Sequence, residues 1–253
     1  MRRILAMVLV CVFAMARVNA ADFAGAFDEG NRFYEQGNYA AAANVYDKLL
    51  QGGQASEALY FNRGDALFKQ GQVGKAIASW RQAEQLAPRD PDVQANLQFA
   101  RTQARGGVPF HADPWARYLG LLTVNEWTVA TTAAGWAFFG LLAAGQWRPE
   151  LGRKLRIWLA VAGVATVVFG SSLAEALSRN YLVATAIVTA GEADVRIGPL
   201  DESQSLYKVR DGIELEILDR KDNWLQVMDS SQRAGWVRQD QVLIWDQARK
   251  GGS

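Results

Sequence analysis

The sequence predicts a multidomain chain with three parts: an all-α repeat solenoid, a hairpin of two membrane-spanning helices and a small all-β barrel. Before residue 91, small and large apolar residues recur every 34 positions. Two later stretches carry no charge over the length of a membrane span, and short alternating segments follow residue 179. A mean hydropathy of −0.08 and a net charge of +1 conceal these three parts, because the averages cancel.

The first 20 residues have the pattern of a secretory signal peptide. Two arginines precede an uncharged apolar stretch, and small residues at 18 and 20 favour cleavage after Ala20. The alternatives are an uncleaved anchor or a lipoprotein signal at Cys11, although the preceding Val10 is not the small residue that such a signal needs. After cleavage at Ala20 the mature chain would contain no cysteine.

The composition argues against several classes of chemistry. One Cys and one His exclude a disulfide framework and a Cys/His zinc site. The near-zero net charge argues against a nucleic-acid binder, which needs a basic surface. No hydrolase elbow, zinc-protease motif or phosphate loop is present, and His111 stands alone in the linker 104–124. We therefore expect no enzyme, no cofactor and no metal site.

The N-terminal repeat consists of two units, 23–56 and 57–90. Their matching positions are Gly30 with Gly64, Phe33 with Leu67, Gly37 with Gly71, Ala42 with Ala76, and Tyr46 with Trp80. The small residues would let two helices of a hairpin approach closely, and the large ones would fill the space between hairpins. The glycines at 37 and 71 would end each first helix in a left-handed turn.

The second unit resembles the tetratricopeptide repeat at Tyr60, Gly64, Leu67, Ala76, Trp80, Ala83 and Pro88. The first unit departs from the pattern at Ala26 and Leu49, and residues 91–103 read as a capping helix that completes the region 23–103. The resemblance implies protein binding in a concave groove lined by the first helices. The candidate groove residues are Asn31, Tyr34, Asn62, Asp65 and Lys69. The alternative is that these side chains are merely solvated helix faces.

Residues 125–146 and 157–175 are the predicted membrane spans. Their uncharged cores would each reach about 27–29 Å, close to the thickness of a bilayer core. Glycines at 135, 140, 163 and 170 would let the two helices pack closely. The alternative is a pair of buried helices, but neither flanking domain is large enough to cover them.

The segment between the spans, 147–156, sets the predicted orientation. It is expected to be a cytoplasmic loop because short basic loops stay in the cytoplasm. The topology-determining residues are Arg148, Arg153, Lys154 and Arg156. Both flanking domains would then lie on the periplasmic side of a bacterial inner membrane, which agrees with a signal peptide.

The C-terminal region 183–247 is predicted to be a small barrel of short strands. The predicted strands are 183–189, 192–196, 205–209, 214–219, 224–228 and 235–237, with Gly, Asp or Asn at the turns between them. The region resembles a bacterial SH3-like domain through residues 193–199, 211–212, 223–227 and 235–237. That resemblance implies binding of proteins or cell-wall peptides. Trp224 and Trp236 could form an aromatic ligand face, unless Trp236 packs against the barrel wall.

The order of these parts resembles the BatE-type proteins of the Bacteroides aerotolerance (Bat) operons. The resemblance implies a non-catalytic inner-membrane scaffold linked to envelope stress tolerance. Its expected partners are membrane-anchored von Willebrand A-domain proteins and, indirectly, a MoxR-type ATPase. A hinge and the hairpin would hold two recognition modules close together, so that weak contacts combine. The alternative function is a cell-wall (peptidoglycan) binding or sensing protein led by the SH3-like domain.

Overall fold

The structure is a computed structural model that describes residues 23–108, 114–179 and 183–245. The expected signal peptide, with Cys11, and the linker residue His111 lie outside the described residues. The chain divides into two compact units, one formed by the helical repeat and the strands together, the other by the apolar hairpin.

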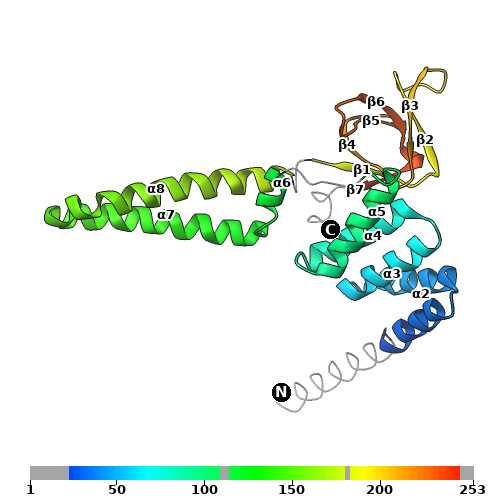
Figure 1. Cartoon of the computed structure of the whole chain (residues 1–253), viewed down its shortest axis with the longest axis horizontal. Coiled ribbons are helices and arrows are strands. Elements are labelled where there is room, and N and C mark those ends of the chain that lie inside the picture. The colour runs from blue at the N-terminus through cyan, green and yellow to red at the C-terminus, as the bar shows by residue number, and fades with distance from the viewer. Residues whose placement is uncertain (1–22, 109–113, 180–182, 246–253) are drawn as a thin grey trace, which may run out of the picture. The chain divides into compact units, whose positions relative to one another are not determined.

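The repeat region is a series of antiparallel helices (Figure 1). The helix formed by residues 23–35 is followed by α2 (Tyr39–Gln51), α3 (Glu57–Lys69), α4 (Val73–Leu86) and α5 (Pro91–Ala104). Gly37 and Gly71 have φ angles of +75° and +77°, so the predicted left-handed turns are confirmed.

The helices pack closely because glycine faces an aromatic ring in each unit. A methyl group at Gly30 would overlap the ring of Tyr46, and one at Gly64 would overlap the indole of Trp80. Both rings are almost fully buried. The glycine and the aromatic residue that recur every 34 positions are therefore in direct contact with each other within each repeat.

The C-terminal strands form one antiparallel sheet of order β3-β2-β6-β5-β4-β1-β7. The strands are β1 (Thr185–Val188), β2 (Glu192–Arg196), β3 (Ser205–Arg210), β4 (Glu214–Lys221), β5 (Trp224–Met228), β6 (Ala234–Arg238) and β7 (Val242–Trp245). The six predicted strands are present, and β7 is an additional strand that the sequence reading did not include.

The predicted closed barrel is wrong for this sheet. In the described residues the two edge strands, β3 and β7, do not pair with each other, so the sheet is open. The reason lies in β7, which pairs with β1 on one side and lies against α4. The inward face still forms an apolar core of alternating residues, which includes Val195, Leu215, Leu225 and Val237.

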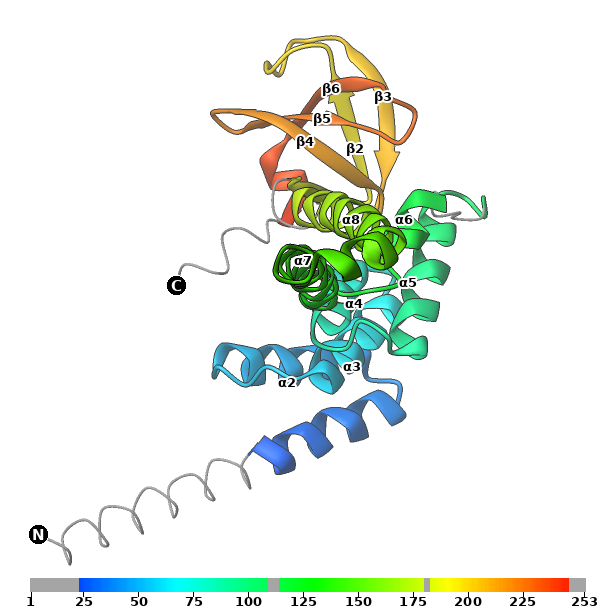
Figure 2. The same ribbon diagram turned by 90° about the vertical axis from the view of Figure 1, so that its left-hand side faces the viewer.

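The sheet and the helical repeat share a core and form one unit. Ile187 of β1 and Trp245 of β7 belong to the same buried cluster as the helical residues Ile77 and Ala104. In both views the sheet lies at the α4–α5 end of the repeat, with α2 toward the opposite end (Figures 1 and 2). The two modules are therefore held together by direct packing.

The second unit is a helical hairpin preceded by the short helix α6 (Pro114–Leu119). Its two long helices are α7 (Val124–Trp147) and α8 (Pro149–Leu177). Two helices, Val124–Trp147 and Lys154–Leu177, are long and apolar enough to cross a membrane, and only 6% and 11% of their apolar windows are buried. That low burial differs from the core helices of a soluble domain.

The predicted glycine packing holds for only one helix of the hairpin. Gly163 and Gly170 on α8 approach Phe138 and Thr131 of α7, whereas Gly135 and Gly140 on α7 face open space. The α6 end of the hairpin is closed by Trp127, which is 2% exposed and donates its indole N–H to the Leu119 carbonyl at 3.0 Å.

The segment 147–156 was predicted to be a loop, and this prediction is wrong because most of the segment is helical. Only Arg148 separates the two helices, because Pro149 starts α8 at its first turn, where its missing N–H costs no hydrogen bond. Arg153, Lys154 and Arg156 lie in the first turns of α8, and the side chains of Lys154 and Arg156 are exposed. These basic residues therefore stay close in sequence to the junction of α7 and α8.

Candidate binding surfaces

The predicted groove residues take part in a polar contact that repeats every 34 residues. In the first repeat, the Asn31 side-chain oxygen accepts hydrogen bonds from the Tyr46 hydroxyl at 2.8 Å and the Asn62 amide at 2.9 Å. In the second repeat, an Asp65 carboxylate oxygen accepts from the Trp80 indole at 3.1 Å and the Asn96 amide at 2.9 Å. Each contact joins one repeat to the first helix that follows it.

These hydrogen bonds divide the predicted groove residues into two groups. Asn31, Asn62 and Asp65 are half-buried and bridge successive helices. Lys69 is exposed, and Tyr34 is half-buried with its ring edge-on to Tyr39 at 5.2 Å. Lys69 is thus the exposed member of the set, and Tyr34 takes no part in the bridging hydrogen bonds.

Asp65 is a partly buried carboxylate with a raised pKa. Burial raises its pKa to about 6, although the hydrogen bonds from Trp80 and Asn96 and the charge of Lys69 act in the opposite direction. The matching residue in the first repeat is Asn31, which has the same shape but no charge. The second repeat therefore bears a carboxylate that the fold accommodates at a cost.

A second polar cluster joins the helical repeat to the sheet. Glu214 of β4 lies between two arginines: its carboxylate contacts Arg101 of α5 at 2.8 Å and Arg81 of α4 at 3.2 Å. Burial alone would raise the pKa of Glu214, but Arg81 and Arg101 hold it below its ordinary value. Arg81 also lies over the Trp245 ring, 5.3 Å from its centre.

The second repeat differs from the first where it meets the sheet. In the first repeat, Asn38 caps α2 by accepting a hydrogen bond from the Ala41 N–H. The matching residue before α4 is Gln72, which makes no such bond. Instead Asp211, from the turn before β4, accepts from the Gly74 N–H at 2.9 Å. The sheet domain supplies the cap that this helix lacks.

Gly74 allows this approach, and Gly212 supports it from the other side. A methyl group at Gly74 would overlap the Val188 carbonyl oxygen of β1, and the matching residue in the first repeat is Ala40. Gly212 has a φ of +85°, and a methyl group there would overlap the Val73 side chain. Two glycines, one from each domain, are thus needed at the interface.

The predicted aromatic ligand face of the sheet is only partly accessible. Trp224 is 8% exposed and lies at the start of β5, so little of its ring remains for a ligand. Trp236 of β6 is half-buried and pairs with Arg196 of β2. Of the two, Trp236 is the more accessible residue.

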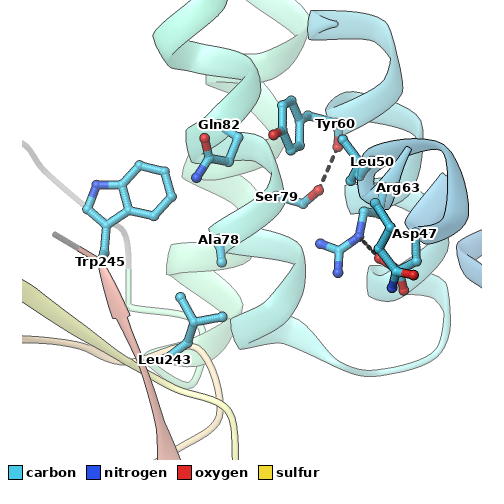
Figure 3. Close-up of a pocket in the computed structure, with 10 residues that line it drawn as sticks. Asp47, Leu50, Tyr60, Arg63, Ala78, Ser79, Gln82, Leu243 and Trp245 are labelled. Atoms are coloured by element: carbon cyan, nitrogen blue, oxygen red, sulfur yellow. Dashed lines mark hydrogen bonds and ion pairs between the residues drawn. The ribbon is translucent and has the colours of Figure 1, made fainter. Parts of the chain in front are cut away.

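Two neighbouring cavities lie between the helical repeat and β7. One has a volume of about 350 Å³ and an apolar side formed by Leu50, Tyr60 and Trp245 (Figure 3). The other, of about 400 Å³, is lined by Asn44, Gln70, Gln72 and Lys75, among others. Leu243, Asp47 and Arg63 line both cavities, and Arg63 donates a hydrogen bond to Asp47 between them.

Sequence reasoning did not single out the residues of this junction. Glu214, Arg81 and Arg101 belong to segments far apart in the chain, and no local pattern connects them. Two signals were available: the replacement of Asn38 and Ala40 by Gln and Gly in the second repeat, and the apolar run 242–245. In the described residues no group of three or more His, Cys, Asp or Glu side chains is placed to hold a metal ion.

Comparisons with known proteins identify two modules. Residues 27–91 match the tetratricopeptide repeat family, and residues 189–246 match the bacterial SH3 domain family. The chain is similar to tetratricopeptide repeat protein 16 from Macaca fascicularis and from Homo sapiens, in each case 35% identical over 74 residues. Those residues are 29% of this chain and span only 8% of each relative's length.

These matches agree with the geometry of the first unit. The tetratricopeptide match covers the helices from residue 27 to the start of α5, and the SH3 match covers the strands from β2 to β7. Both families are typical of binding modules without catalytic chemistry. The chain therefore contains tetratricopeptide repeats and a bacterial SH3 domain, packed together in one unit.

Proposed function

We propose that this chain is a non-catalytic scaffold of the bacterial inner membrane that binds partner proteins on the periplasmic side. The observation that carries the proposal is the Glu214 cluster, because it joins two binding modules within one compact unit. The hairpin of α7 and α8 would anchor that unit, with the basic residues at its tip in the cytoplasm. The signal peptide would direct the N-terminal domain outward.

The proposed partners are membrane-anchored von Willebrand A-domain proteins, within a Bat complex that a MoxR-type ATPase serves. This finer assignment is supported by the order of the modules in the sequence. A role in envelope stress tolerance follows from the same resemblance.

Capture of partners from crosslinked membranes tests the proposal. Full-length protein is expected to recover A-domain membrane proteins, and the groove variant Tyr34→Ala with Lys69→Glu is expected to recover at least about five-fold less. Lys48→Glu, an exposed change on α2, is the matched control and should recover as much as the unaltered chain. Equal recovery by all three proteins would contradict a role for the groove, and no A-domain protein in any of them would contradict the partner assignment.

A second candidate function is peptidoglycan binding through the SH3 domain. The bacterial SH3 match and the partly exposed Trp236 favour it. Full-length protein in detergent should then sediment with purified peptidoglycan, and Trp236→Ala should reduce the bound fraction without changing the thermal unfolding. If the protein stays in the supernatant, this function is excluded.

A further inference from the structure

The edge of β7 that faces away from β1 has no partner strand among the described residues. The hydrogen bonds show which backbone groups point to that edge. Thr189 donates its N–H to the Gln241 carbonyl, whereas Val188 bonds through both backbone groups to Gly212 and Ile213 on the β4 side. Because bonded and non-bonded pairs alternate in antiparallel strands, Val242 and Ile244 direct their backbone groups away from β1.

Not every group at this edge is available. The Val242 N–H bonds back to the Gln239 carbonyl, which leaves the Val242 carbonyl and both backbone groups of Ile244. These groups flank Leu243, so one extended segment could bond to all three. An edge strand of this kind is a template for an added strand.

The two cavities are arranged along β7. Trp245 and Leu243 line the cavity with Leu50 and Tyr60 (Figure 3). Leu243 also lines the polar cavity with Lys75. Side chains two residues apart on a strand are about 7 Å apart and lie on the same face. A strand beside β7 would therefore direct alternate side chains toward the two cavities.

The charges of the polar cavity favour an acidic side chain. Asp47 and Arg63 are paired with each other, and the remaining polar residues are the uncharged amides Asn44, Gln70 and Gln72. Lys75 is exposed and forms no ion pair within the described part of the chain, so it is the cation of this lining without a carboxylate in contact; the more distant carboxylate of Asp211 feels its charge. The cavity lined by Trp245 is also continuous with the interface between repeat and sheet, since Trp245 belongs to the buried cluster of that interface.

We propose that the two cavities along β7 bind an extended polypeptide segment of a partner protein, which adds as a strand to the outer edge of β7. The segment places an apolar side chain in the cavity of Leu50, Tyr60 and Trp245, and an acidic side chain two residues away beside Lys75. The inference rests on the proposed protein-binding function, and it adds the class of ligand. The site exists only because the SH3 domain is docked on the second repeat.

Selection from a library of random heptapeptides displayed on phage tests this proposal, with full-length protein in lipid nanodiscs as the target. The enriched sequences should share an acidic and an apolar residue two positions apart. Their synthetic forms should bind Ile244→Pro at least about ten-fold more weakly, because proline removes the outward N–H. Proline is tolerated at such a position on an edge strand. Ile244→Val keeps the N–H and is the matched control.

A change in the peptide itself separates strand addition from other modes of binding. N-methylation of alternate residues should abolish binding in one register and leave it within about two-fold in the other, because only one edge of the peptide faces β7. Lys75→Glu should reverse the preference for the acidic residue. Absence of enrichment over empty nanodiscs, or equal binding to Ile244→Pro and Ile244→Val, would overturn the inference. Capture of A-domain proteins by Ile244→Pro would show that the proposed function stands without it.

Discussion

The two tetratricopeptide units of this chain have the same length and much the same core, yet only the second one holds the SH3 domain. The first repeat caps its own helix with Asn38 and has Ala40 in the first turn of α2. The second has Gln72 and Gly74 at these positions, and takes its cap from Asp211 of the SH3 domain. The comparison teaches that a repeat becomes a docking platform through a few changes at its helix start.

The comparison predicts that the interface fails when its buried charge is removed. Glu214→Gln leaves Arg81 and Arg101 close together without a counter-charge, which is expected to lower the free energy of unfolding of this unit by about 3 kcal/mol. Urea unfolding of the full chain in detergent micelles measures the loss. Glu192→Gln is the control, because its ion pair with Lys208 is exposed to solvent and its loss is expected to leave the urea midpoint nearly unchanged.

The same cluster predicts a pH dependence. The pKa of Glu214 is lowered in the folded state, so its stabilisation is present above the ordinary pKa of a glutamate and is lost as the pH falls through that range. The unaltered chain should therefore lose more stability between pH 5 and about pH 3 than the Glu214→Gln variant. Identical pH profiles for the two proteins would contradict a buried ionic contact.

Gly74→Ala tests the difference between the two repeats where α4 and β1 approach most closely. The new methyl group would overlap the Val188 carbonyl, so either α4 or β1 has to move, at a cost of about 2 kcal/mol. Hydrogen exchange should then speed up in the peptides that contain β1 and β7. Ala40→Gly, the reciprocal change in the first repeat, is expected to cost no more than about 1 kcal/mol and to leave exchange in β1 and β7 unchanged.

The smallest expected effect concerns Asp65 and its counterpart Asn31. The pKa of about 6 lies above the value in an unfolded chain, so the folded state binds the proton more tightly and stability falls as the pH rises from about 4 to 6. Asp65→Asn keeps both acceptor contacts and should raise stability at pH 7.5 by about 1 kcal/mol, with little change at pH 4. Thermal unfolding at the two pH values measures this.

The reciprocal change, Asn31→Asp, provides the control for Asp65. It should introduce the same pH dependence into the first repeat, because Asn31 accepts the matching hydrogen bonds from Tyr46 and Asn62. If Asp65→Asn and the unaltered chain change stability equally between pH 4 and pH 7.5, the raised pKa of Asp65 is wrong.

The turns, the strands and the long apolar helices of this protein could be predicted from its sequence alone. The glycines at 37 and 71 specify left-handed turns because only glycine adopts them without strain, and the match of Gly30 and Gly64 with Tyr46 and Trp80 specifies the contact inside each repeat. Alternation of apolar residues was sufficient to locate six strands, and uncharged length was sufficient to locate two long apolar helices. These signals are periodic, and they act between residues that are close along the chain.

Only the tertiary structure decided how the modules combine. The Glu214 cluster, the cap from Asp211 and the cavities beside β7 join residues more than 100 positions apart, and no local pattern encodes such pairs. The position of β7 belongs here too, since β7 lies against α4 and does not pair with β3 in the described sheet. The burial of charge and the overlap of atoms depend on three-dimensional proximity, and that is the physical reason why the interface could not be read from the sequence.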